Sequence, residues 1–213
     1  MKTDELIETL GVTVERVEGR LFRNAFIVAL IFGAALALCA MQALLGMSPS
    51  ALRESHLGLA LLIAALVAGV VVAGSRYLLK AAYPGMSVRG PTALLVVIIA
   101  TFLCAGVAGL LAAHPSARSA MIFGPMWPVC LACIPLFSIG PFLALVWALR
   151  KGAPTKLRST GAVAGLVAGA VGAGACALHQ PGGSLPFIGL WYVGPILLCA
   201  LLGAVLGSRV LRW

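Results

Sequence analysis

The sequence predicts an all-α integral membrane protein with six transmembrane helices. Of its 213 residues, 62% are hydrophobic and only 10% are charged, whereas a soluble domain carries about 25% charged residues. The apolar residues gather in runs of about 20 or more without Asp, Glu, Lys or Arg, which is the length that a helix needs to cross a bilayer. Little of the chain is left outside these runs, which excludes a large extramembrane catalytic domain.

Six such runs follow one another along the chain, separated by charged, polar or Pro/Gly-rich segments. The spans built on them cover about residues 24–47, 56–79, 91–113, 121–149, 159–179 and 187–208. The first span is expected to stay in the membrane, because its apolar run is longer than that of a signal peptide and the opening MKTDELIETL is acidic. The organisation is therefore a tail of residues 1–22 followed by a transmembrane domain of residues 23–213.

The basic residues predict that both termini are cytoplasmic. Lys and Arg are retained on the cytoplasmic side of a membrane. All but two of the 15 basic residues lie in the tail, in the loops after the second and fourth spans, or at the C-terminus; the exceptions are Arg53 and Arg118. Topology thus accounts for the net charge of +9, and we expect no direct binding of nucleic acid.

The fourth span contains several prolines, and we expect it to be bent or interrupted near Gly140 and Pro141. Aromatic residues at the outer ends of the fourth and sixth spans, Trp127, Trp191 and Tyr192, are interpreted as anchors at the membrane interface. A binding site at the broken helix is the alternative to a kink that only shapes packing.

The fifth span carries Gly161, Gly165 and Gly169 at a four-residue spacing on one helical face. Small residues at this spacing let helices approach closely in lipid. The pattern predicts a central packing helix, with a homodimer interface as the alternative.

The apolar runs contain no acidic or basic side chain, although such groups usually mark proton relays and coupled transport. The sequence also lacks a Ser/His/Asp set, an HExxH motif and a carboxylate pair at usable spacing. We therefore expect no enzyme and no cofactor. A small multi-pass transporter or channel for a metal or neutral substrate is the alternative function.

All six cysteines lie within the spans, and the histidines lie at the outer face. Cys130 and Cys133 are one helical turn apart, and Cys176 and His179 are at the outer end of the next span. Thiolate and imidazole bind soft or borderline metals. The four residues are candidates for a metal or redox sensor, with Cys130, Cys176 and His179 as candidate metal ligands and apolar packing as the alternative.

The tail is the only substantial segment outside the membrane. Residues 1–18 contain five acidic and two basic residues, and an apolar stripe runs through them. A short acidic amphipathic helix suits the groove of a partner better than an anionic membrane surface. The candidate partner-binding residues are Asp4, Glu5, Leu6, Ile7, Glu8 and Leu10. The alternative is a solvated lead-in to the first span.

Several segments resemble the NrsF family of bacterial membrane anti-sigma factors. They are the opening MKTDELIETL, the central WPVCLACIPLFSIGPFLALVWALRKGAPT, the glycine-rich fifth span with its final ALH, and the closing LPFIGLWY. The resemblance implies a multi-pass protein of the bacterial inner membrane that holds an extracytoplasmic-function sigma factor and releases it upon stress, heavy metals included. It implies that the sigma factor and the lipid bilayer are the partners and that the tail binds the sigma factor.

The resemblance also implies that outer-face cysteines take part in sensing. Cys130 matches the family cysteine in CLxxIPL, but the second family cysteine, which directly follows ALH, is replaced here by Gln180. Gln cannot form a thiolate, a disulfide or a strong bond to a soft metal. Cys176, one turn earlier, or Cys133 beside Cys130 can take its place.

Overall fold

The computed structural model describes residues 19–46, 57–83, 86–124, 127–152, 154, 156–179 and 184–210, and these contain no strand. Their helices are α2 (Gly19–Leu44), α3 (Leu57–Ala81), α4 (Arg89–Ala112), α5 (Pro115–Ile122), α6 (Trp127–Leu149), α7 (Leu157–His179), α8 (Leu185–Trp191) and α9 (Val193–Val210). Among these residues six helical segments are long and apolar enough to cross a membrane, α5 with α6 forming one and α8 with α9 another. The all-α class and the number of spans are confirmed.

The predicted tail lies mostly outside the described residues. The amphipathic helix therefore stays a prediction, as do its partner-binding residues Asp4, Glu5, Leu6, Ile7, Glu8 and Leu10. At the inner edge of the tail α2 already begins at Gly19, so that residues 19–22 belong to the first helix. Gln180 also lies outside the described residues.

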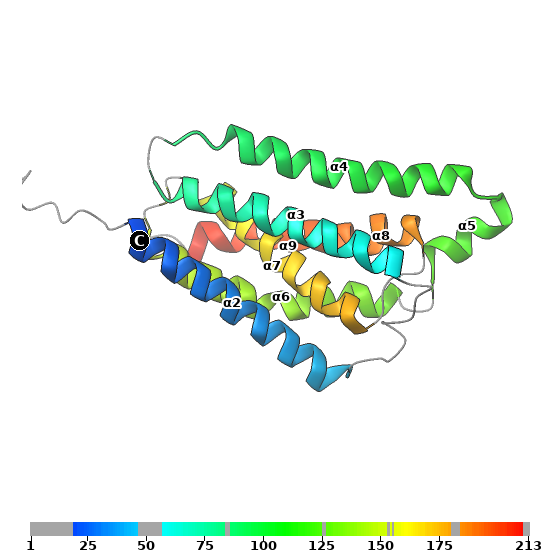
Figure 1. The fold of residues 1–213 in the computed structure, drawn as a ribbon, viewed down its shortest axis with the longest axis horizontal. Coiled ribbons are helices and arrows are strands. Elements are labelled where there is room, and N and C mark those ends of the chain that lie inside the picture. Colours follow the sequence, from blue (N-terminus) through cyan, green and yellow to red (C-terminus); the bar gives the residue numbers. More distant parts are fainter. Residues whose placement is uncertain are drawn as a thin grey trace, which may run out of the picture.

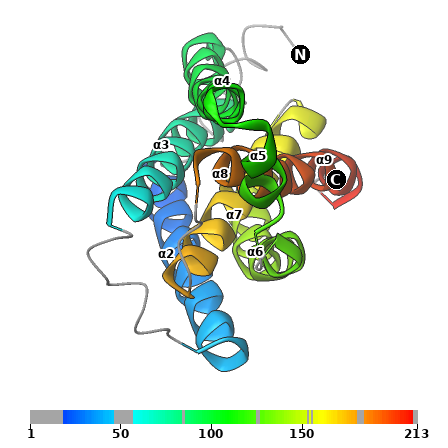
Figure 2. The same ribbon diagram turned by 90° about the vertical axis from the view of Figure 1, so that its right-hand side faces the viewer.

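Helix α7 is the centre of the bundle. Figure 2 shows it surrounded by α2, α3, α6 and α9, all of which contact it. In contrast, α4 packs mainly along α3 and α8 at one side of the bundle (Figures 1 and 2). The buried share of the membrane-spanning window is 67% in α7 and 11% in α4. The prediction of a central packing helix for the fifth span is confirmed.

Glycines explain how α7 reaches this position. Gly161 and Gly165 face Gly203 and Gly207 of α9, and a Cβ atom on Gly207 would come within 2.6 Å of the Gly161 Cα. Atoms cannot pack at that distance, so only glycine allows the two backbones to meet here. Lipid tails are as apolar as leucine, and helices in a membrane therefore associate through such close contact.

The fourth span is interrupted at a different place from the one predicted. Helix α6 is continuous through Gly140 and Pro141, and the break lies earlier, between α5 and α6. Proline removes one backbone hydrogen bond, but Pro141 is buried against Gly33 of α2, where a Cβ would come within 2.7 Å of the proline Cα. This close contact supports the helix at the proline. The predicted interruption at Gly140 and Pro141 is wrong, whereas a bend there stays a prediction.

The sixth span is divided at Tyr192, which separates α8 from α9. Pro195 in the first turn of α9 has no N–H to donate to the carbonyl of Trp191, four residues earlier, and its ring crowds that carbonyl. Tyr192 is fully buried at the break, with 0% of its surface exposed. Its interpretation as an anchor at the membrane interface is therefore wrong.

The two ends of the bundle differ in charge. Figure 1 shows the beginnings of α2, α4 and α7 at the same end as the last turns of α3, α6 and α9. All basic residues in the described part of the chain lie toward this end except Arg118, and none of the described residues is acidic. Arg118 lies at the opposite end, where it donates hydrogen bonds to the carbonyls of Ala113 and Leu111. The bundle thus has one basic end.

Candidate functional site

The candidate sensing residues lie at the end of the bundle opposite the basic one. Helices α6 and α7 are antiparallel, and Gly172 lets them approach: a Cβ there would lie 2.6 Å from the carbonyl oxygen of Ile134. Cys130 lies one turn before Ile134, and Cys176 lies one turn after Gly172. The close approach therefore brings the two cysteines to the same level of the bundle.

The thiols of Cys130 and Cys176 interact with each other, and the thiol of Cys130 also interacts with Tyr192. Both cysteines are buried, with 4% and 3% of their surfaces exposed, and no disulfide joins them. They belong to the largest apolar cluster of the bundle, together with Ile134 and Tyr192. We call Cys130 and Cys176 the thiol pair.

The other two candidates stand apart from this contact. Cys133 is half-buried and packs against the edge of the cluster. The Nδ1 atom of His179 is 2.9 Å from the carbonyl oxygen of Gly46, just beyond α2, so that the ring links α7 to the end of that helix. No group of three His, Cys, Asp or Glu residues in the described part of the chain is placed to hold a metal ion. The structure thus brings together two of the three candidate ligands, Cys130 and Cys176.

Two indole rings contact each other at the cluster that contains the thiol pair. The ring centroids of Trp127 and Trp191 are 4.9 Å apart, and both rings pack against the cluster that contains the pair. The indole N–H of Trp191 donates to the carbonyl of Ile122 at 2.8 Å, and the Ser184 hydroxyl donates to that of Met121 at 3.0 Å. These bonds fasten the end of α5 to α8.

Tyr192, a neighbour of the thiol pair, is not among the site residues predicted from the sequence. The signal was present in Pro195, because a proline three residues further on indicates that a helix starts near Tyr192. At this break the Tyr192 side chain is fully buried in the bundle. Arg150 is used in the sequence-based prediction only to mark the cytoplasmic side. In the structure its guanidinium donates two hydrogen bonds to the carbonyl of Val210.

The fold and the thiol pair define a class of protein. It is a helical bundle with six segments long and apolar enough to cross a membrane, with one basic end and with the buried thiol pair toward the other end. The family model described as negative regulator of sigma F, NrsF, matches residues 10–213. The chain belongs to this family, which consists of regulators and not of enzymes.

Two relatives match over their whole length. A protein of Azospira oryzae named "Probable anti-sigma-F factor NrsF" is 35% identical over 220 residues, and the alignment covers 100% of both chains. A protein of Caulobacter vibrioides named "Anti-sigma-F factor NrsF" is 31% identical over 218 residues, again with 100% of both chains covered. No solved structure matches the chain.

Proposed function

We propose that this protein is a membrane-bound anti-sigma factor that sequesters an extracytoplasmic-function sigma factor through its N-terminal tail. The observation that carries the proposal is the full-length similarity to two proteins named as anti-sigma-F factors. Sigma factors act in the cytoplasm, and Lys and Arg are retained on that side of a membrane. The proposal therefore places the basic end and both termini on the cytoplasmic side of the bacterial inner membrane.

The tail is suited to such a partner by its composition. Leu6, Ile7 and Leu10 form an apolar stripe that can fill a groove, which is how a few side chains supply most of the binding energy at an interface. The acidic residues Asp4, Glu5 and Glu8 accompany the stripe, and their charge favours encounter with a basic surface. The tail joins α2 directly, so a bound sigma factor is held at the membrane.

The double variant Leu6→Asp, Leu10→Asp tests the tail. We expect the sigma factor to co-purify with the full-length parent and to be lost from this variant, because charged groups cannot occupy an apolar groove without a large desolvation cost. The matched control is Thr9→Asp, Thr13→Asp, which adds the same charge and leaves the leucines in place. Equal recovery of the sigma factor with the parent and the leucine variant would refute the tail as anchor.

Release upon envelope, heavy-metal or redox stress is the second part of the proposal, and we assign the sensing step to the thiol pair. A soft metal ion would bind both sulfurs and displace their protons. Hydrogen peroxide would convert the two thiols to a disulfide while being reduced to two waters, which take up both thiol protons. Either product links the start of α6 to the end of α7. A signal shifts a conformational equilibrium only if it favours one state. The link between the two sulfurs does so, because it fixes the distance between the start of α6 and the end of α7 and thereby favours the arrangement of the helices that has this distance.

The variant Cys130→Ser tests the thiol pair. We expect that a higher concentration of a thiol-reactive ion such as Cd²⁺ is needed to release the sigma factor, because serine oxygen is a weak ligand for soft metals. Cys104→Ser is the control, since Cys104 is exposed on α4. If the dose response of the Cys130 variant equals that of the parent, Cys130 is only a packing residue.

A further inference from the structure

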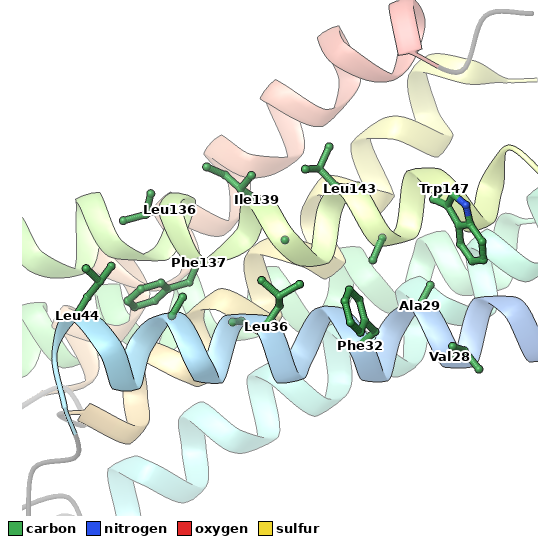
Figure 3. Close-up of a pocket in the computed structure, with 14 residues that line it drawn as sticks. Val28, Ala29, Phe32, Leu36, Leu44, Leu136, Phe137, Ile139, Leu143 and Trp147 are labelled. Atoms are coloured by element: carbon green, nitrogen blue, oxygen red, sulfur yellow. The ribbon is translucent and has the colours of Figure 1, made fainter.

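A long apolar groove runs along the surface of the bundle between α2 and α6. Its volume is about 780 Å³, and side chains of both helices line it (Figure 3). Among them are Val28, Phe32 and Leu36 of α2 and Ile139, Leu143 and Trp147 of α6. Gly140 also lines the groove, and a Cβ there would touch the Leu36 side chain at 3.4 Å. A large residue at this position would therefore fill part of the groove.

The groove is long enough for an acyl chain. Its lining residues run from Leu136 to Trp147 on α6 and from Val28 to Leu44 on α2, which correspond to about 16 Å and about 24 Å of α helix. The hydrocarbon core of a bilayer is about 30 Å thick, so the groove extends over half or more of it. Phe32, Leu143 and Trp147 keep 61%, 59% and 53% of their surfaces exposed, which leaves the groove open to the side. A molecule can thus enter from the surrounding lipid.

A positive charge lies at one end of the groove. The Nζ atom of Lys151 is 3.9 Å from the ring centroid of Trp147, which Figure 3 shows near one end of the lining residues. Lys151 is exposed. The neighbouring Arg150 directs its guanidinium to the carbonyl of Val210. The Lys151 ammonium is thus a cation at this end of the groove.

We infer that the groove between α2 and α6 binds an acyl chain of an anionic phospholipid whose phosphate contacts Lys151. The apolar lining is complementary to a hydrocarbon chain, and the ammonium is complementary to the headgroup. A basic residue near a membrane surface attracts anionic lipid by about 1 kcal/mol, which is a factor of about five in affinity. The inference does not depend on the sigma factor.

Fluorescence quenching by brominated lipids tests the site. The full-length protein is reconstituted in phosphatidylcholine vesicles that contain equal fractions of brominated phosphatidylglycerol or brominated phosphatidylcholine. The contribution of Trp147 is the difference in fluorescence quenching between the parent and the variant Trp147→Phe. We expect phosphatidylglycerol to bind about fivefold more tightly than phosphatidylcholine. Lys151→Gln should abolish this preference, whereas Lys156→Gln, the same charge change on an exposed residue outside the groove, should retain it.

Native mass spectrometry provides a second measurement that needs no tryptophan variant. Phosphatidylglycerol should bind equally well to the parent and to the Lys156 variant, and about fivefold more weakly to the Lys151 variant. Equal affinity for the two lipids in the parent, or an unchanged preference in Lys151→Gln, would overturn the inference. So would efficient crosslinking between two copies through Leu143→Cys, because a second copy of the chain would then occupy the groove.

Discussion

The contact between α7 and α9 and the contact between α2 and α6 represent two ways of joining helices in this protein. Along the α7–α9 contact, glycines of one helix meet backbone atoms of the other over several turns, from Gly161 to Gly169. At the α2–α6 contact, Gly33 meets the backbone of Pro141, and a groove of about 780 Å³ opens beside it. Backbone meets backbone along the first contact, and the cavity of about 260 Å³ that Gly165 and Gly203 help to line is smaller than the groove beside the second contact. We therefore expect α2 to shift relative to α6 more readily than α9 relative to α7.

This difference matters because the tail is attached to α2. A conformational signal that starts at the thiol pair reaches α6 and α7 first, and α2 contacts both of these helices. Packed interfaces switch between discrete arrangements rather than deforming smoothly. The looser α2–α6 contact is therefore where we expect a rearrangement, while the α7–α9 contact serves as the fixed part.

Gly165→Ala should have the largest effect on stability. The new Cβ would collide with the backbone carbonyl of Cys199 and come within 3.1 Å of the Gly203 Cα. Backbone atoms cannot move aside without moving α9, so we expect a loss at or above the upper end of the about 1–3 kcal/mol typical of overpacking. The temperature at which the purified protein loses its monodisperse elution profile measures this loss. An unchanged temperature would show that the contact is not tight.

Gly33→Ala should have a smaller effect. The Cβ would lie 2.7 Å from the Pro141 Cα, but the adjacent groove allows α2 to shift outward. We expect a loss near the lower end of the same range, about 1 kcal/mol. The same thermal measurement checks it, together with a change in Trp147 fluorescence as the groove changes shape. A loss as large as that of the Gly165 variant would abolish the contrast between the two contacts.

Gly194→Ala should leave the stability unchanged or slightly raise it. No atom lies within 4 Å of a Cβ at this position in the first turn of α9, and alanine is favoured over glycine in a helix by up to about 1 kcal/mol. The variant is the matched control for the other two. If it lowered the thermal midpoint as they do, the loss in those variants could not be attributed to backbone contact.

The spans were predictable from the sequence because bilayer thickness dictates helix length, and the apolar runs have that length. The glycine face of α7 was predictable for a related reason, since four-residue spacing is a helical repeat. The continuity of α6 through Pro141 was not, because a proline breaks or only strains a helix according to what packs against it. Gly33, 108 positions earlier in the chain, packs on Pro141.

The candidate site was predictable only in part. Cys130 and Cys133 share one face of a helix by spacing alone, but the contact between Cys130 and Cys176 depends on the register of two helices. Gly172 sets that register by its approach to the Ile134 carbonyl. The groove could not be found from the sequence, because lipid-facing and helix-facing side chains of a membrane protein are equally apolar.

The glycine-rich composition of α7 has a consequence for how the protein enters the membrane. Small residues contribute little transfer free energy, and α7 has the lowest mean hydropathy of the six spans. Insertion of a helix into the bilayer during synthesis depends on that free energy. The helix around which the bundle is built is thus the one that the bilayer accepts least readily alone, and we expect its insertion to depend on the presence of α6, which is synthesised immediately before it.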